Sequence, residues 1–121
     1  MEEATCEWDV YIVDEVRHWI EALGEADFDR MIDAINLLRI HGPALGRPAV
    51  DTIKGSTIPN LKELRQGTVR VLFAFDPWRS CILLVVGDKA NRWNVWYEDS
   101  IPLAEARYSQ YIEDRKAEEE K

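Results

Sequence analysis

Two arginines and a glutamate in residues 61–75 have a spacing that could bring three charged side chains together. Glu63 and Arg65 are two residues apart, and Arg70 follows the turn-forming pair Gln66-Gly67. Neighbouring side chains of a strand point to opposite faces, and here the stronger apolar alternation marks the core side. We therefore expect Glu63, Arg65 and Arg70 to share the open face of a sheet. The residues expected to face the core are Leu64, Val69, Val71, Phe73 and Phe75.

More basic and aromatic residues follow the last apolar run, in a segment without a clear period: Lys89, Arg92, Trp93 and Tyr97. Guanidinium groups bind phosphate oxygens through paired N–H donors and stabilise negative charge that develops on them. Aromatic rings stack on unpaired bases. A carboxylate or a phenol could accept the proton of a ribose 2′-hydroxyl. These residue types would suit the binding and cleavage of an RNA phosphodiester without a metal ion.

The same charges have a second interpretation. Arg65 and Arg70 could pair across strands with Glu63 and other carboxylates on a solvated face, as opposite charges often do in antiparallel sheets. The two histidines do not help to decide, because His18 and His41 fall on predicted helices away from this stretch. Residue types alone leave both interpretations open.

Three short apolar runs, residues 61–65, 68–75 and 79–86, would position the charged cluster. Gln66-Gly67 separates the first two runs, and Asp76-Pro77-Trp78 separates the second from the third. Glycine tolerates positive φ and proline ends a strand, so both separators are typical of turns. The pattern predicts an antiparallel meander of three strands.

The chain before the meander predicts one strand and two helices. Residues 7–13 alternate apolar and polar side chains, which is typical of a half-buried strand. Asp14 is a suitable N-cap for a first helix that Gly24 would end. A second helix is expected from about Asp27 to His41, with an apolar stripe at helical spacing. Residues 42–59 are rich in glycine and proline and predict a long surface loop.

A final helix is expected near the C-terminus, capped by Asp99 or Ser100 and with Pro102 in its first turn. Residues 113–121 are polar all round and predict a frayed acidic end. The expected order is therefore β-α-α-β-β-β-α. It defines an α+β domain spanning residues 1–121, with a small, mostly antiparallel sheet and helices packed on one face.

Composition and charge limit the classes of function. The net charge is −8, which argues against binding nucleic acid through a broad basic surface. Residues 1–49 hold 11 acidic and 4 basic residues, whereas residues 50–107 hold 7 and 8, so a local basic patch remains possible in the meander. Cys6 and Cys81 are far apart and two isolated histidines complete no zinc site, so we expect no metal and no cofactor. No membrane span or signal peptide is visible, which favours the cytoplasm.

Three segments in this order carry a resemblance to a known family: Leu61-Lys62-Glu63-Leu64-Arg65, then residues 69–76, then a hydrophobic run that ends in Lys89. With the helical hairpin before them, they resemble the RelE/ParE superfamily of toxin–antitoxin toxins, and more narrowly its HigB-like, phage-derived branch. The resemblance covers residues 8 to 112. It implies the RelE fold and a toxin that cuts mRNA on the ribosome without metal, by attack of the 2′-hydroxyl on the adjacent phosphate.

The resemblance also implies roles for individual residues. Arg65 and Arg70 match the strand arginines that hold the phosphate, and Lys89 matches the basic residue after the last strand. Tyr97 and Glu63 are rival candidates for proton transfer. Lys54 and Lys62, with Arg92 and Trp93, would contact RNA. The implied partners are the ribosome, mRNA and a helix-turn-helix antitoxin.

Two departures from the family keep other functions open. Many relatives are strongly basic and this chain is acidic, and no histidine stands near the site. One alternative is therefore a ParE-type toxin that inhibits DNA gyrase without cutting RNA. Another is an inactive member of the fold that only binds a partner.

Overall fold

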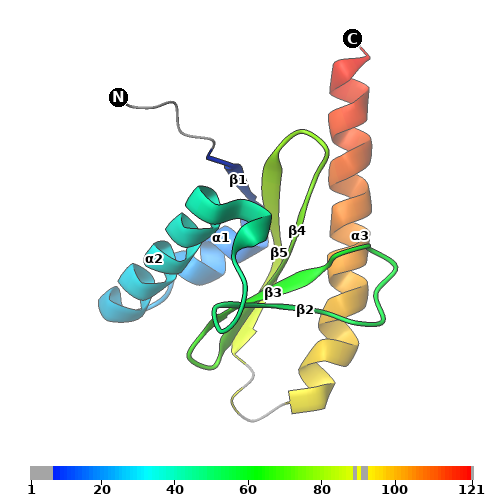
Figure 1. Ribbon diagram of the computed structural model, residues 1–121. Helices are drawn as coiled ribbons and strands as arrows, with labels where there is room; N and C mark the ends of the chain where they lie inside the picture. The colour runs from blue at the N-terminus through cyan, green and yellow to red at the C-terminus, as the bar shows by residue number, and fades with distance from the viewer. Residues whose placement is uncertain (1–6, 89, 91–92, 121) are drawn as a thin grey trace, which may run out of the picture.

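The computed structural model describes residues 7–88, 90 and 93–120. Figure 1 shows α-helices around one sheet. Residues 89, 91 and 92, on which two site predictions fall, lie outside the described residues, as does the side chain of Trp93. In chain order the elements are β1 (Asp9–Ile12), α1 (Asp14–Glu21), α2 (Glu25–His41), a 3-10 turn (Gly42–Ala44), β2 (Val50–Thr52), β3 (Lys62–Gln66), β4 (Val69–Phe75), β5 (Ser80–Asp88) and α3 (Trp93–Glu119).

The sheet has the strand order β1-β5-β4-β3-β2. The predicted meander forms β3, β4 and β5, which pair antiparallel, and β1 joins β5 in parallel. The α+β class and the helical hairpin are therefore confirmed. The order differs by one strand, because β2 forms inside the predicted loop and pairs with β3.

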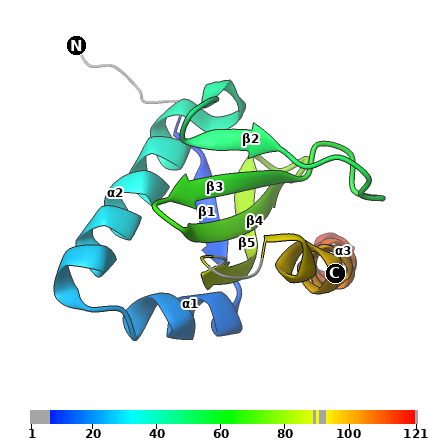
Figure 2. The ribbon, with the colours of Figure 1, turned by 90° about the horizontal axis from the view of Figure 1, so that it is seen from below.

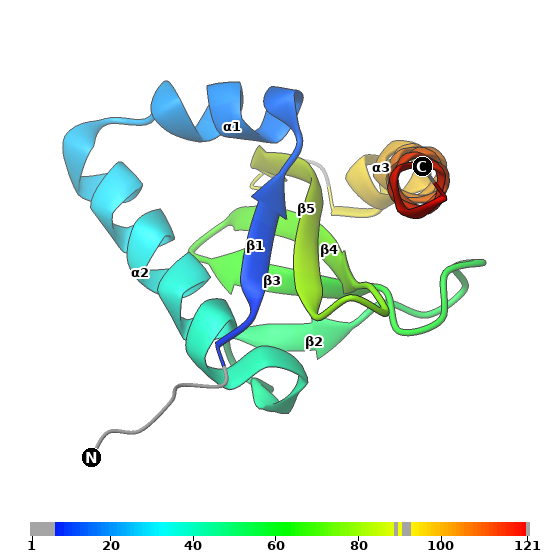
Figure 3. The same ribbon diagram turned by 90° about the horizontal axis from the view of Figure 1, so that it is seen from above.

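Helices cover both faces of the sheet, not one face as predicted. Figures 2 and 3 show α1 and α2 on one side and α3 on the other. Met31 and Leu38 of α2 pack with Phe73 on the first side. On the second side, α3 contributes Trp96 and Ala104 to a core with Leu72, Ala74, Ile82 and Leu84. Strands β4 and β5 are apolar on both faces, which is typical of strands buried on both sides. The prediction used only the more apolar face of each strand, so it missed the core between the sheet and α3.

The start of α3 was also predicted wrongly. The helix begins at Trp93 and not at residue 99 or 100, so Pro102 lies inside it and not in its first turn. Pro102 is exposed, and Figures 1 and 3 show α3 bent in this part, as expected where proline removes a helical hydrogen bond. The early start is explained by Trp96, Ser100 and Ala104, which are buried at intervals of four residues. Residues 113–119 are helical and continue α3, and the fraying of this end stays a prediction.

The N-termini of the first two helices differ slightly from the prediction. The N-cap of α1 is Val13, which makes no side-chain cap, and Asp14 is the first helical residue. The Asp14 carboxylate instead accepts a hydrogen bond from Arg17 Nη2 at 2.6 Å. A carboxylate in the first turn still stabilises the positive end of the helix dipole. Helix α2 begins at Glu25, slightly before the predicted Asp27.

A buried aspartate holds the second half of α3 to the turn between β4 and β5. Asp76 Oδ1 accepts hydrogen bonds from the backbone N–H groups of Trp78 and Ser80, at 2.9 and 2.7 Å. Its Oδ2 accepts one from the Tyr111 hydroxyl at 2.7 Å and lies 3.6 Å from Arg115 Nη1. We call this group the Asp76 clamp. It fixes α3 far from the charged residues of β3 and β4.

Candidate functional site

The register of the sheet brings the predicted charged residues together. Arg65 of β3 lies directly opposite Arg70 of β4, and Glu63 lies opposite Leu72. On the other side of β3, Glu63 lies opposite Asp51 of β2. All four charged side chains therefore belong to one face of the sheet, the face on which α3 packs. Glu63, Arg65 and Arg70 therefore share one face as predicted, but α3 packs on that face, so it is not the open face that the sequence indicated.

Glu63 is the centre of this cluster. Its Oε2 accepts a hydrogen bond from Arg65 Nε at 2.9 Å and lies 2.8 Å from Arg65 Nη2. Its Oε1 accepts a hydrogen bond from the Tyr97 hydroxyl at 2.6 Å and lies 3.9 Å from Arg70 Nε. Glu63 is only 3% exposed. The ion pairs of the second interpretation exist, but they lie partly beneath α3 and not on a solvated face.

Arg70 is held in place by its own turn. Its Nη1 donates to the carbonyl oxygens of Gly67 at 2.6 Å and Val69 at 3.0 Å. Gly67 adopts φ 62°, a conformation that glycine reaches without strain. The Arg70 side chain is 12% exposed, and its buried Nε has no hydrogen-bond acceptor among the described residues. It lies 3.9 Å from Glu63 Oε1, which is an ion-pair distance, so the hydrogen bonding of this buried donor is incomplete.

Arg65 is the more accessible of the two arginines, with 35% of its side chain exposed. Asp51 Oδ2 accepts a hydrogen bond from Arg65 Nη2 at 3.1 Å, so two carboxylates orient the guanidinium. The hydrogen bond with Glu63, above all, raises the pKa of Arg65. The Arg47 hydrogen bond is the main reason that the pKa of Asp51 is lowered. Both groups are therefore charged at neutral pH.

Asp51 was missed in the sequence because residues 42–59 predict a loop. The only signal was the short alternation Val50-Asp51-Thr52 after Pro48, which is too short to establish a strand alone.

Tyr97 reaches the site because α3 approaches β5 closely. The Trp96 ring lies on Gly87, where an added Cβ would stand 2.2 Å from Trp96 Nε1. Only glycine leaves room for this ring, and Gly87 lies directly opposite Arg70. The next residue, Tyr97, extends over Glu63. Burial, followed by the hydrogen bond to the Glu63 carboxylate, raises the pKa of Tyr97 to about 12.

The raised pKa of Tyr97 predicts a loss of stability in alkali. In the unfolded chain the phenol ionises near pH 10, whereas in the folded chain it stays protonated to about pH 12. Above pH 10 the unfolded state therefore loses its proton first, and the free energy of unfolding falls as pH rises from 10 to 12. Urea unfolding at pH 9, 10, 11 and 12 measures this fall. Tyr97→Phe should make it shallower, and equal slopes for variant and wild type would contradict the assignment.

Other predicted contacts lie apart from the cluster. Lys54 is exposed in the loop after β2, and Glu105 of α3 holds that loop by accepting hydrogen bonds from Ser56 Oγ and the Thr57 backbone N–H. Lys62 lies opposite Phe73, so it belongs to the other face of β3 from Glu63. Lys89, Arg92 and the Trp93 side chain lie outside the described residues.

The part of the chain that the structure describes brings no three side chains of histidine, cysteine, aspartate or glutamate close enough to hold a metal ion. Within the same residues, no helix is both long and apolar enough to cross a membrane. Cys81 is a buried free thiol whose pKa is raised by burial.

Solved RelE toxins share this fold. The chain matches RelE in the archaeal RelE–RelB complex of Pyrococcus horikoshii with a TM-score of 0.59 and 19% identity, over 70% of this chain and 98% of that one. It matches a free Escherichia coli RelE mutant with a TM-score of 0.51 and 12% identity, over 79% and 96% of the two chains. The architecture is therefore that of the RelE-type toxins.

Sequence similarity identifies the family within the RelE-type toxins. The model of the family described as phage derived protein Gp49-like matches residues 18–109. The chain is 44% identical over 105 residues to the toxin HigB3 of Mycobacterium tuberculosis, covering 85% of this chain and 92% of that protein. It is 41% identical to HigB2 of the same organism, covering 83% of this chain and 52% of that longer protein. The chain belongs to the phage-derived Gp49-like family, among the HigB-type toxins of type II toxin–antitoxin systems.

Proposed function

We propose that this protein is a ribosome-dependent mRNA endonuclease that inhibits translation in the cytoplasm. The observation that carries the proposal is the cluster in which Glu63 contacts Arg65, Tyr97 and Arg70, whose buried Nε has no hydrogen-bond acceptor among the described residues. A phosphate oxygen is an acceptor that would complete the hydrogen bonding of Arg70. The family supports the same activity.

The cluster supports cleavage by the 2′-hydroxyl. A Tyr97 pKa of about 12 keeps the phenol protonated at neutral pH, so Tyr97 alone is a poor base. Its hydrogen bond suggests a relay, in which the phenol oxygen takes the 2′-hydroxyl proton while its own proton passes to Glu63 Oε1. The 2′ oxygen then bonds to phosphorus, the bond from phosphorus to the 5′ oxygen breaks, and water protonates that oxygen. The products are a cyclic phosphate and a 5′-hydroxyl.

Two arginines would stabilise the charge that develops on the phosphate. Arg65 is oriented by Glu63 and Asp51 and is partly exposed, so it would meet the RNA first. Arg70 is deeper and already fixed by backbone carbonyls, so its position needs little change on binding. Lys54, Lys62, Lys89, Arg92 and Trp93 remain the proposed contacts with RNA.

The proposed partners are the ribosome with its bound mRNA and a cognate antitoxin. A net charge of −8 disfavours binding to free RNA, so we expect the ribosome to present the substrate. RelE of Pyrococcus horikoshii was solved in complex with RelB, and a helix-turn-helix antitoxin is proposed to neutralise this chain.

Purified protein in a reconstituted translation reaction tests the activity. We expect primer extension to show mRNA cleavage only when programmed ribosomes are present, with a cyclic phosphate on the upstream fragment. Arg65→Ala should cut more slowly, whereas Arg30→Ala, on the exposed surface of α2, should match wild type. Intact mRNA in every reaction, or equal cleavage without ribosomes, would contradict the proposal.

A second candidate is inhibition of DNA gyrase, the activity of ParE-type toxins. A related candidate is an inactive member of the fold that only binds a partner. The acidic net charge and the internal pairing of Arg65 favour these candidates over a nuclease. A gyrase supercoiling assay with the same preparation separates gyrase inhibition from nuclease activity, because an mRNA endonuclease leaves supercoiling by gyrase unchanged.

A further inference from the structure

The first strand leaves one of its edges open. The backbone N–H groups of Asp9 and Val13 donate to Arg79 and Leu83 on the β5 side, at 3.2 and 3.3 Å. Backbone groups of alternate residues in a strand point the same way, so Val10 and Ile12 direct theirs to the opposite side. Strand β1 is the last strand of the sheet, and no other described strand lies on that side.

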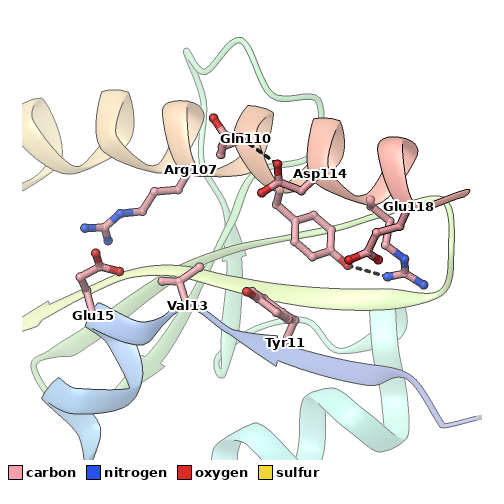
Figure 4. Close-up of a pocket in the computed structure, with 9 residues that line it drawn as sticks. Tyr11, Val13, Glu15, Arg107, Gln110, Asp114 and Glu118 are labelled. Carbon is pink, nitrogen blue, oxygen red and sulfur yellow. Dashed lines mark hydrogen bonds between the residues drawn. The ribbon is translucent and has the colours of Figure 1, made fainter. Parts of the chain in front are cut away.

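A groove runs beside this open edge, between β1 and the second half of α3 (Figure 4). It exists because α3 packs over β4 and β5, which leaves the face of β1 uncovered. Its volume is about 590 Å³. It is lined from β1 and α1 by Tyr11, Val13 and Glu15, and from α3 by residues that include Arg107, Tyr111 and Glu118.

The floor of the groove is aromatic. Tyr11 is 50% exposed, and its ring lies 5.1 Å from the ring of Tyr111. Arg115 stacks over Trp78 at 5.0 Å and donates to the Tyr111 hydroxyl at 2.8 Å. The rings of Tyr11 and Tyr111, which line the groove, offer a surface for the stem of a long side chain or for a cation.

The rim of the groove is acidic. Glu15, Asp114 and Glu118 are exposed along it. Of its two arginines, Arg115 lies beside the buried carboxylate of Asp76 and is compensated there. Arg107 donates to the Leu84 carbonyl oxygen at 2.7 Å and points toward Glu15 in Figure 4. The remaining charge is negative and attracts a cationic ligand.

We infer that this groove binds an extended peptide segment with basic side chains at alternate positions, as a sixth strand beside β1. Backbone hydrogen bonds to Val10 and Ile12 would give affinity, and every second side chain would enter the groove. There a lysine or arginine stem would cross Tyr11 and place its charge near Glu118. The inference does not depend on the proposed nuclease activity.

The open edge sets the length of the segment. At one end, the Trp8 backbone N–H donates to the Arg39 carbonyl oxygen of α2 at 2.9 Å, which closes the edge. At the other end, α1 begins at Asp14. Only the four residues of β1 are open, so the partner contributes a strand of about four to five residues.

Titration of the isotopically labelled full chain with two synthetic peptides tests the inference. The probes are Thr-Lys-Val-Lys-Val-Lys-Thr and its glutamate analogue, Thr-Glu-Val-Glu-Val-Glu-Thr, both capped. For the lysine peptide we expect amide shifts at Val10, Ile12 and Glu118, and at least about tenfold weaker binding of the glutamate peptide. Equal binding of both, no binding of either, or shifts centred on the exposed Leu37 and Ile40 of α2 would overturn it.

Two changes test the mode of binding. Glu118→Lys should weaken binding of the lysine peptide several-fold, whereas Asp29→Lys, the same charge change on exposed α2, should not. Val10→Pro removes an outward N–H and spares the pairing with β5, so it should abolish binding. If that variant does not fold, two lysine peptides replace it, one with its backbone nitrogens methylated at the odd residues and one at the even residues. Only one of these sets of N–H groups would face β1, so only one of the two peptides should lose binding. Equal binding of both peptides would contradict strand pairing.

Discussion

Replacing Arg70 by alanine is expected to lower the rate of ribosome-dependent mRNA cleavage by about 100- to 1000-fold, the usual cost of removing one donor that stabilises transition-state charge. Arg70 is fixed by the carbonyl oxygens of Gly67 and Val69 before substrate binds. Its Nε has no hydrogen-bond acceptor among the described residues and lies 3.9 Å from Glu63 Oε1, where the transferred proton would arrive. Single-turnover cleavage on programmed ribosomes measures the loss.

Two variants control this prediction. Arg70→Lys keeps the charge but lacks the guanidinium fork, so we expect it to recover little of the rate. Arg30→Ala removes an arginine from an exposed ion pair on α2 and should cleave like wild type. Circular dichroism and thermal melting show whether each variant folds. A folded Arg70→Ala protein that cleaves at the wild-type rate would remove Arg70 from the site.

Glu63 is expected to matter for both stability and activity. Glu63→Ala leaves Arg65 and Arg70 facing each other across β3 and β4 without the carboxylate that contacts both. Asp51 still pairs with Arg65, but the Tyr97 hydroxyl loses this acceptor. Removing one partner of a buried ion pair costs about 3–5 kcal/mol. Urea unfolding at neutral pH should show a loss of this size in the free energy of unfolding.

Glu63→Gln separates the two roles of this residue. The amide oxygen can still accept a hydrogen bond from Arg65 or Tyr97, so we expect a smaller loss of stability than for alanine. An amide does not accept the 2′-hydroxyl proton, so cleavage should fall by about 100- to 10,000-fold. A stable Glu63→Gln protein with the wild-type cleavage rate would show that the proton goes elsewhere.

The charged cluster could be predicted because it depends on local rules. Side chains alternate along a strand, and Gln66-Gly67 sets a tight turn, so Glu63, Arg65 and Arg70 had to share a face once β3 and β4 paired. An apolar run after a turn located β5, and apolar residues at helical spacing located the helical hairpin. These features need only neighbouring residues in the chain.

The rest of the site depends on contacts between distant segments. Asp51 reaches Arg65 only because β2 adds to the sheet edge, and its three residues give no signal of their own. Tyr97 reaches Glu63 only because α3 starts early and Trp96 fits on Gly87. Neither contact follows from the periodicity of one segment, so neither could be derived without the tertiary structure.

Through α3, the Asp76 clamp links the turn between β4 and β5 to the position of Tyr97. Tyr97 and Tyr111 are fourteen residues apart in this helix, which is at most about 21 Å because the helix bends between them. At one end the Tyr111 hydroxyl donates a hydrogen bond to Asp76, and at the other end the Tyr97 hydroxyl donates one to Glu63. A tilt of about 3° at the clamp would move Tyr97 by about 1 Å over this length, and a misplacement of about 1 Å can cost about 100-fold in rate. The turn between β4 and β5 thus sets the alignment of a hydroxyl group at the far end of the helix.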